Sequence, residues 1–88
     1  MTVAIVILNW NGKNWLKKFL PSVIEHSSEA DIVVIDNAST DHSIEFLKSN
    51  FPQIKIVKNQ KNSGFAAGYN QGLKSIQADI YCLLNSDI

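Results

Sequence analysis

The stretch Val3–Gly12, VAIVILNWNG, decides the fold of this 88-residue chain. Its first six residues are apolar without interruption and mostly β-branched, which is typical of a strand buried on both faces of a parallel sheet. The next four, Asn-Trp-Asn-Gly, form a polar cluster of the kind that ends a strand in a turn. Apolar runs recur further along, so the sequence predicts four strands, at Val3–Leu8, Ile32–Ile35, Ile54–Val57 and Ile80–Leu84.

Helical patterns lie between these strands. Apolar residues recur at helical spacing over Trp15–Ile24, Ile44–Phe51 and Phe65–Ile76. Pro21 removes a hydrogen bond from the first segment, so we expect a kink or a break there, near Phe19. Strands that alternate with helices imply parallel pairing through right-handed crossovers. The sequence therefore predicts a single α/β domain, a doubly wound parallel sheet of four strands in the order 3-2-1-4 with helices on both faces.

The composition excludes some classes of function. The chain has eight Lys, no Arg and eight Asp plus Glu, which gives a formal net charge of zero. A nucleic-acid-binding face needs a surplus of basic residues, so we expect no nucleic-acid partner. The apolar N-terminal run is too short to span a membrane and lacks the basic flank and cleavage site of a signal peptide. Cys82, the single cysteine, lies in an apolar run, where we expect a buried structural thiol.

The polar ends of the strands are the candidate site. In open parallel sheets, ligands bind beyond the carboxyl ends of the strands, close to the point where the strand order reverses. In the order 3-2-1-4 the second and fourth strands flank the first, so Asp36 and Asp87 should lie on either side of Trp10. Asp36 either caps its own turn or accepts a hydrogen bond from a nucleotide base or a ribose hydroxyl. Trp10 is either a core filler or an aromatic wall for a base.

Several residues near the helix ends have expected structural roles. Ser39, Thr40 and Asp41 precede the second helix and are all good capping residues, and for Asp41 we expect an N-cap role. His26 and His42 have no metal-ligand spacing and no obvious acid partner in the sequence. We therefore expect both histidines at helix ends or caps.

Asn85 and Asp87 follow the fourth strand and are candidate metal ligands. Residues two apart in an extended segment point the same way, so both side-chain oxygens can face one cation. Ligation by oxygen alone suits Mg²⁺ or Mn²⁺. Such an ion would bind a diphosphate and stabilise its charge as it leaves. The alternative is a plain turn after the strand.

A segment rich in glycine and asparagine precedes the fourth strand. Two glycines inside a helix cost roughly 1 kcal/mol each relative to alanine, so they need a reason. Either the backbone lies close to phosphates at the start of a helix, or the glycines allow tight packing of a helix on the sheet. The residues concerned are Asn62, Gly64, Gly68, Asn70 and Gly72.

Four motifs resemble those of the family 2 glycosyltransferases, which have the Rossmann-like GT-A fold. They are Val3–Gly12, Val33–Asp41, Leu83–Asp87 and Asn62–Gly72, the last of which looks like the rhamnosyltransferase-like branch. The motifs occur in the family's order and cover essentially the whole chain. The resemblance implies that residues 1–88 are the nucleotide-sugar-binding N-terminal portion of a GT-A glycosyltransferase domain, truncated before the acceptor-binding part.

The resemblance also implies a reaction. It is the transfer, with inversion, of a sugar from a UDP- or dTDP-sugar to a hydroxyl of a glycan or lipid-linked acceptor, as in polysaccharide biosynthesis. In such enzymes the residue at Asp36 contacts the base, and the loop after the first strand lines the same pocket. The expected nucleotide-binding residues are Asn9, Trp10, Asn11, Asp36, Asn62, Gly64 and Asn70.

The family's Asp-x-Asp motif falls on Asn85-Ser86-Asp87, with Asn at the first position. The resemblance therefore makes Asp87 the primary ligand of Mg or Mn and Asn85 a weaker one. The catalytic base is expected beyond Ile88, so the 88-residue chain alone is expected to be inactive. We expect a cytoplasmic protein, with the full-length enzyme peripheral at the inner face of the membrane.

Two other functions remain open. An NAD-dependent oxidoreductase domain would need the Gly-x-Gly-x-x-Gly fingerprint, whereas the first turn has one glycine, Gly12. A non-catalytic nucleotide-binding or self-associating module would form a homo-oligomer through the exposed edge of the fourth strand.

Overall fold

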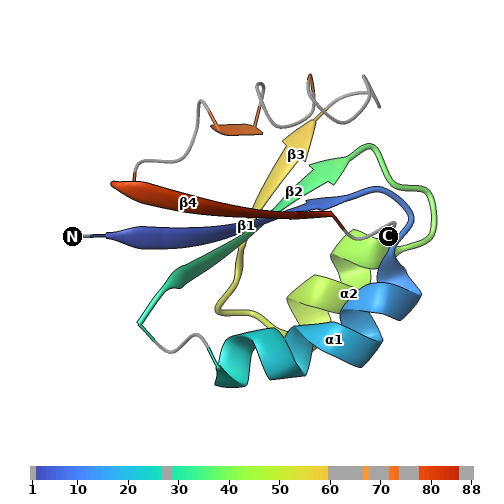
Figure 1. The fold of residues 1–88 in the computed structure, drawn as a ribbon. Coiled ribbons are helices and arrows are strands. Elements are labelled where there is room, and N and C mark those ends of the chain that lie inside the picture. Colours follow the sequence, from blue (N-terminus) through green and yellow to red (C-terminus); the bar gives the residue numbers. More distant parts are fainter. Residues whose placement is uncertain (1, 27–28, 60–66, 68–71, 74–77, 86–88) are drawn as a thin grey trace.

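The computed structural model describes residues 2–26, 29–59, 67, 72–73 and 78–85. Four parallel strands form one sheet in the order β3-β2-β1-β4, as the sequence predicts (Figure 1). No helix within the described ranges is long and apolar enough to cross a membrane. The elements are β1 (Val3–Asn9), α1 (Lys13–Glu25), β2 (Asp31–Asn37), α2 (Ser43–Asn50), β3 (Lys55–Asn59) and β4 (Ile80–Asn85).

The carboxyl ends of the strands form a polar edge. Leu8 of β1 pairs in register with Asn85 of β4, and Asn9 of β1 pairs with Asp36 of β2. Each of the four strands ends at an asparagine. The strands therefore end almost level with one another, and polar side chains lie along this whole edge of the sheet.

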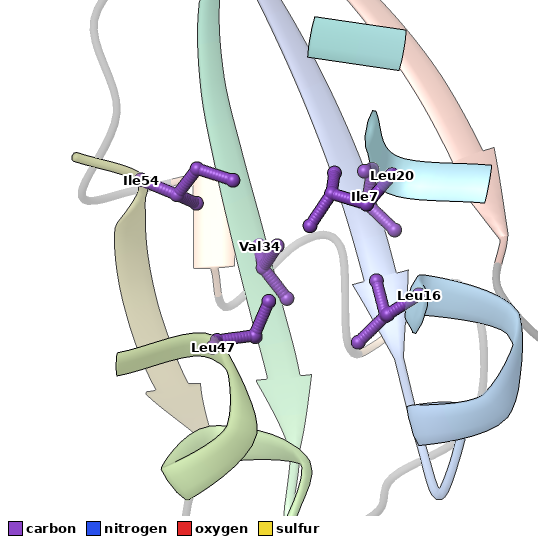
Figure 2. Close-up of a cluster of buried hydrophobic side chains, with 6 residues drawn as sticks. All are labelled: Ile7, Leu16, Leu20, Val34, Leu47 and Ile54. Carbon is purple, nitrogen blue, oxygen red and sulfur yellow. The ribbon is translucent and has the colours of Figure 1, made fainter. Parts of the chain in front are cut away.

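Figure 2 shows the core between the sheet and helices α1 and α2. Successive residues of a strand point to opposite faces, so Ile7 and Val34 face the helices while their chain neighbours face away. Leu16 and Leu20 of α1 and Leu47 of α2 are fully buried against them. Full burial of such a side chain stabilises the fold by about 1.5–3 kcal/mol. The buried cluster consists of Ile7, Leu16, Leu20, Val34, Leu47 and Ile54.

A second core lies on the opposite face of the sheet. Leu73 and Ala78 pack against it, and the backbone is helical at Ala67, Gly72 and Leu73. The sheet therefore carries helical residues on both faces, as the sequence predicts. The buried residues of this core are Ala4, Val6, Leu8, Val33 and Ile35.

Gly72 lies directly against β2. A Cβ atom added to Gly72 would lie 2.3 Å from Cδ1 of Ile35 and 2.7 Å from its Cγ1 and Cγ2, closer than Cβ atoms approach other heavy atoms. Close packing of the helical backbone on the strand is therefore the reason for this glycine. The other residues of the expected phosphate-binding segment, Asn62, Gly64, Gly68 and Asn70, lie outside the described residues.

Replacing Gly72 with alanine is expected to destabilise the chain by about 1–3 kcal/mol, because overpacking outweighs the gain of about 1 kcal/mol in helix propensity. Urea unfolding measures this cost. In the Ile35→Val background the nearest atom, Cδ1, is absent, so Gly72→Ala should cost less there, and a double-mutant cycle gives the coupling. Equal costs in the two backgrounds would show that the overlap with Cδ1 of Ile35 does not contribute to the cost of Gly72→Ala.

Of the kink or break predicted near Phe19 in the first helix, the break does not occur. α1 runs without interruption from Lys13 to Glu25, with Pro21 inside it. An interior proline costs about 3 kcal/mol, but residues on both sides of it, Leu20 before and Val23 after, pack into the same core. Pro21 itself is exposed, so its ring displaces no core side chain. Tertiary packing therefore holds both halves of α1 on the sheet.

The prediction of a buried thiol at Cys82 is wrong, because Cys82 is exposed. β4 is an edge strand that pairs with β1 alone among the described strands. Its apolar residues Ile80, Tyr81 and Leu83 are also exposed. The apolar run correctly predicted a strand, but it carried no information on whether the faces of that strand are covered.

Candidate functional site

Asp36 and Asn9 meet at the carboxyl ends of β2 and β1. Their exposed fractions are 1% and 0%, and a buried carboxylate is costly unless hydrogen bonds satisfy it. Oδ1 of Asp36 accepts hydrogen bonds from Asn9 Nδ2 at 2.9 Å and Ser39 Oγ at 2.7 Å, while Oδ2 accepts the Ser39 backbone N–H at 3.0 Å. At its other end, Asn9 Oδ1 accepts the Gly12 N–H at 3.1 Å. Asp36 therefore caps its own turn, one of its two expected roles, and its contact with a base stays a prediction.

The first loop, residues 10–12, and the second loop, residues 38–42, are joined by hydrogen bonds. The Asn11 N–H donates to Ser39 Oγ at 2.9 Å, and the Thr40 N–H donates to Asn11 Oδ1 at 2.7 Å. These bonds run in both directions between loops that are far apart in sequence. The two loops therefore form one hydrogen-bonded unit above the ends of β1 and β2.

Both loops contain residues in the left-handed region of backbone conformation. The φ angles are 52° at Asn11, 64° at Ala38 and 66° at His42, and these are the non-glycine residues with positive φ in the described part of the chain. Asparagine tolerates this conformation, whereas a residue such as alanine loses about 1–2 kcal/mol in it. Backbone strain of this kind concentrates at functional sites. Because all three of these residues lie in the two loops, this edge of the sheet is the candidate site.

Asp41 joins the N-termini of both helices. Its Oδ2 accepts the N–H of Lys13, the first residue of α1, at 3.0 Å. Its Oδ1 accepts the N–H of Ser43, the first residue of α2, at 3.0 Å, and also a hydrogen bond from the Ser43 hydroxyl. The N-cap positions themselves hold Gly12 and His42, and neither makes a side-chain cap bond. One carboxylate therefore caps two helices, whose dipoles both favour its negative charge.

These contacts change the ionisation of Asp41. Burial opposes ionisation, but hydrogen bonds from the Ser43 hydroxyl and from the N–H groups of Lys13 and Ser43 outweigh it, so the pKa of Asp41 lies below its ordinary value of 3.8. A folded-state pKa below the unfolded one gives a stabilisation that is present above the unfolded pKa. This stabilisation is lost as the pH falls through the folded-state pKa.

Asp41→Asn is therefore expected to destabilise the chain near neutral pH, with a difference from wild type that shrinks as the pH falls from about 4 to about 2. Urea unfolding of both proteins over this pH range measures the difference in their free energy of unfolding. The titration of all other groups affects both proteins alike and so largely cancels in this difference. Asp31→Asn, a change at an exposed aspartate at the start of β2, is the matched control. A difference that is constant with pH would contradict the role assigned to the Asp41 carboxylate.

Trp10 follows β1 in the first loop, and 45% of its surface is exposed. The interpretation of Trp10 as a core filler is therefore wrong. An exposed indole beside the joined loops is suited to stacking against a planar ring, because aromatic faces attract apolar and planar groups. Its role as a wall for a base stays a prediction.

Asn85, the expected weaker metal ligand, lies at the end of β4 and is half-buried. β2 and β4 flank β1 as predicted, which brings Asp36 and Asn85 to either side of the end of β1. Asp87 lies outside the described residues, so its position relative to Trp10 stays a prediction. Among the residues that the structure describes, no group of three or more His, Cys, Asp or Glu could hold a metal ion.

Two of the contacts described above were not anticipated from the sequence. The spacing of Asp36 and Ser39, Asp-x-x-Ser, is a local signal, since aspartate side chains often bind backbone groups a few residues further on. The reach of Asp41 to Lys13 crosses 28 residues of sequence. No local pattern encodes such a cap, because it depends on β1 and β2 being neighbours.

Comparison with known protein families gives a match over nearly the whole chain. The family described as Glycosyl transferase family 2 matches residues 4–88. The glycosyltransferase GlyA of Streptococcus pneumoniae serotype 4 is 30% identical over 88 residues, which cover 97% of this chain and 13% of GlyA. The uncharacterised glycosyltransferase YfnE of Bacillus subtilis is 31% identical over 93 residues, covering all of this chain and 24% of YfnE. The chain thus spans a quarter or less of these relatives.

Solved structures share the fold. The S. aureus protein TarS, residues 1–349 in complex with UDP-GlcNAc, aligns with a TM-score of 0.83 and 22% identity over 99% of this chain and 27% of that one. The mannosyltransferase PcManGT from Pyrobaculum calidifontis, in complex with GDP-Man and Mn²⁺, aligns with a TM-score of 0.82 and 20% identity. That alignment covers 97% of this chain and 27% of PcManGT.

Proposed function

The chain belongs to glycosyltransferase family 2, and on this premise we propose that it forms the part of such an enzyme that binds a nucleotide-diphosphate sugar. Its fold is the Rossmann-like GT-A fold. The observation that carries the proposal is the hydrogen-bonded unit of the first and second loops, because it lies at the sheet edge where parallel α/β sheets bind ligands.

The nucleotide base is proposed to bind at the joined loops, against the exposed indole of Trp10. The exposed ring of Trp10 supplies a face for stacking. A carboxylate has about four acceptor positions, and Asp36 uses two on Oδ1 and one on Oδ2. The remaining position on Oδ2 is proposed to accept an N–H of the base. Asn9 and Asn11 hydrogen-bond the second loop and so position both loops at the proposed base site.

The diphosphate is proposed to lie toward β4 and the segment that contains Asn62, Gly64 and Asn70. A divalent cation, Mg²⁺ or Mn²⁺, is proposed to bind through Asp87 and, more weakly, Asn85. The donor set fits such an ion, because carboxylate and amide oxygens are the hard ligands that both cations prefer. The Mn²⁺ in the PcManGT complex supports this proposal. When bound, the ion supplies charge stabilisation to the leaving diphosphate.

The complete enzyme is proposed to transfer the sugar with inversion to a hydroxyl of a glycan or lipid-linked acceptor. Inverting transfer needs a carboxylate base beside the acceptor hydroxyl, and we propose that this base lies outside the 88 residues. Membership of the family supports the transferase activity. The UDP-GlcNAc and GDP-Man bound by the two solved structures support a nucleotide-sugar donor.

A panel of nucleotides tests the proposal. UDP, GDP, dTDP and NAD are added separately to the chain, with and without Mn²⁺, and the melting temperature and the heat of binding are measured. A ligand at about one hundred times its Kd stabilises the native state by about 2.7 kcal/mol. At least one nucleoside diphosphate is expected to bind, more tightly with Mn²⁺. Binding of NAD alone would instead support an oxidoreductase domain.

Trp10→Ala is expected to weaken binding of that nucleoside diphosphate by about tenfold, because stacking of a base on an aromatic ring contributes about 1–3 kcal/mol. Isothermal titration calorimetry measures the change. Phe19→Ala removes another exposed aromatic ring, on α1, and should leave the affinity unchanged. Equal affinities for wild type and Trp10→Ala would show that the indole does not take part in nucleotide binding.

A self-associating module is a second candidate, and the edge of β4 favours it. The exposed residues Ile80, Tyr81 and Leu83 lie on a strand without charged residues, whereas the other edge strand, β3, contains Lys55 and Lys58. Charged residues on an edge strand oppose pairing with a second copy. A homo-oligomer through β4 is therefore proposed, and light scattering tests it. A dimer that dissociates in Leu83→Lys and binds no nucleotide would support this candidate over the first.

A further inference from the structure

Ser39 lies at the centre of the hydrogen bonds that join the two loops. Its hydroxyl donates to Asp36 Oδ1 at 2.7 Å and accepts hydrogen bonds from Asn9 Nδ2 at 3.2 Å and the Asn11 N–H at 2.9 Å. Its backbone N–H donates to Asp36 Oδ2 at 3.0 Å. Ser39 therefore contacts three of the residues predicted to bind nucleotide, although it is not one of them.

The direction of each of these bonds is determined by its partners. A hydroxyl has one proton and two lone pairs. Asn9 Nδ2 and the Asn11 N–H are donors, so they occupy the lone pairs, and the single proton goes to the Asp36 carboxylate. All the hydrogen-bonding capacity of the Ser39 hydroxyl is therefore used, and the group has no second orientation that satisfies its partners.

The same bonds make the two oxygens of Asp36 unequal. Oδ1 accepts two hydrogen bonds, from Asn9 and from the Ser39 hydroxyl, whereas Oδ2 accepts one, from the Ser39 N–H. Because Asp36 is almost fully buried, a small rotation of its carboxylate would change which oxygen can accept another hydrogen bond. Ser39 donates one hydrogen bond to each oxygen of the Asp36 carboxylate and so fixes the rotation of this group.

We propose that Ser39 is the positioning residue of the nucleotide site. Its hydrogen bonds hold the Asp36 carboxylate in the orientation in which Oδ2 has an unused acceptor position. It also holds Asn9 and Asn11, and with them the first loop, in place. The inference rests on the proposed binding of a nucleoside diphosphate at this edge of the sheet. Ser39 acts through Asp36 and Asn11 and makes no contact with the ligand in this proposal.

The test compares wild type with Ser39→Ala, Ser39→Thr and Ser22→Ala. Ser39→Ala removes the hydroxyl, and Ser39→Thr restores it. Ser22→Ala is the matched control, because it removes an exposed serine hydroxyl from α1, outside both loops. For each protein, calorimetry gives the Kd for UDP, GDP and dTDP, and urea unfolding gives the stability.

Ser39→Ala is expected to weaken nucleoside-diphosphate binding by about tenfold, the effect of losing one hydrogen bond to a charged group. Ser39→Thr should recover most of the affinity, and Ser22→Ala should bind as wild type does. A Ser39→Ala protein that is less stable but binds with unchanged affinity would overturn the proposal. So would a Ser39→Thr protein that binds as weakly as Ser39→Ala.

A second measurement without nucleotide separates this inference from the proposed function. Hydrogen exchange of the Asn11 amide and the NMR shifts of the Asn9 side-chain amide report directly on the bonds to the Ser39 hydroxyl. Faster Asn11 exchange and shifted Asn9 signals in Ser39→Ala, restored in Ser39→Thr, support the positioning role. If wild type binds no nucleotide, the proposed function fails; unchanged spectra in Ser39→Ala overturn the positioning role itself.

Discussion

Replacing Asp36 with alanine is expected to lower the free energy of unfolding by about 2–4 kcal/mol, because buried and half-buried donors lose their acceptor. The Ser39 N–H and hydroxyl and Asn9 Nδ2 all donate to this carboxylate. A fully buried donor left unsatisfied costs about 1–3 kcal/mol, and the half-buried donors of Ser39 cost less because water can reach them. Asn9 Nδ2 keeps the Ser39 hydroxyl as a second acceptor, so the two donors of Ser39 carry most of the loss. Urea unfolding at neutral pH measures it.

Two further variants calibrate this result. Asp31→Ala removes an exposed aspartate at the start of the same strand and is expected to change stability by no more than about 0.5 kcal/mol. Asp36→Asn keeps one acceptor oxygen but places an amide N–H opposite another donor. Its loss of stability should therefore lie between those of Asp36→Ala and Asp31→Ala. If Asp36→Ala lowered the free energy of unfolding no more than Asp31→Ala does, the hydrogen bonds to Asp36 would not exist as described. The candidate site that rests on them would then be wrong.

The arrangement of the strands could be predicted from the sequence because each strand is a short apolar run bounded by polar residues. Parallel pairing and the order 3-2-1-4 then followed from the alternation of strands and helices. The ends of the strands were less predictable. β1 and β2 extend to Asn9 and Asn37, since side-chain hydrogen bonds allow these polar residues to be buried in the sheet.

The uninterrupted α1 helix at Pro21 and the exposure of Cys82 have a common physical origin. The prediction of a kink or a break at Pro21 came from local backbone chemistry, and the prediction of a buried Cys82 came from local hydrophobicity. In both cases the outcome depends on what packs against the segment, which a local pattern does not contain. The core holds α1 together across Pro21, and the edge position of β4 leaves Cys82 exposed.

Part of the candidate site could also be read from the sequence. The polar ends of β1 and β2 converge as predicted, with Asn9 in register with Asp36. The helix caps could not be assigned, because Ser39, Thr40 and Asp41 are all good capping residues. The left-handed backbone at His42 places that residue at the N-cap and leaves the carboxylate of Asp41 to reach both helices. His26 and His42 do lie at helix ends, as expected. The expectation that His42 lacks an acid partner is wrong, because its Nδ1 lies 3.7 Å from Oε2 of Glu45, one helical turn away.

Leu20→Ala is the second substitution with a large expected effect, a loss of about 2–5 kcal/mol in the free energy of unfolding. Leu20 has no exposed surface and packs with Ile7 and Leu16 between α1 and the sheet. Truncation removes buried apolar surface and leaves a cavity that close-packed neighbours fill only partly. Leu83→Ala, the same chemical change at a leucine that is 46% exposed on β4, is the matched control. It is expected to cost less than about 1 kcal/mol.

The difference between these two leucines tests how the core and the site are connected. α1 contains Pro21, so its position on the sheet depends on buried side chains such as Leu20 rather than on helix propensity. The first residue of α1, Lys13, is bound by Asp41 of the second loop. Loosening α1 should therefore also loosen this contact, and Leu20→Ala should speed hydrogen exchange of the Lys13 amide whereas Leu83→Ala should not. Equal losses of stability for the two variants would mean that α1 does not anchor the loops to the sheet.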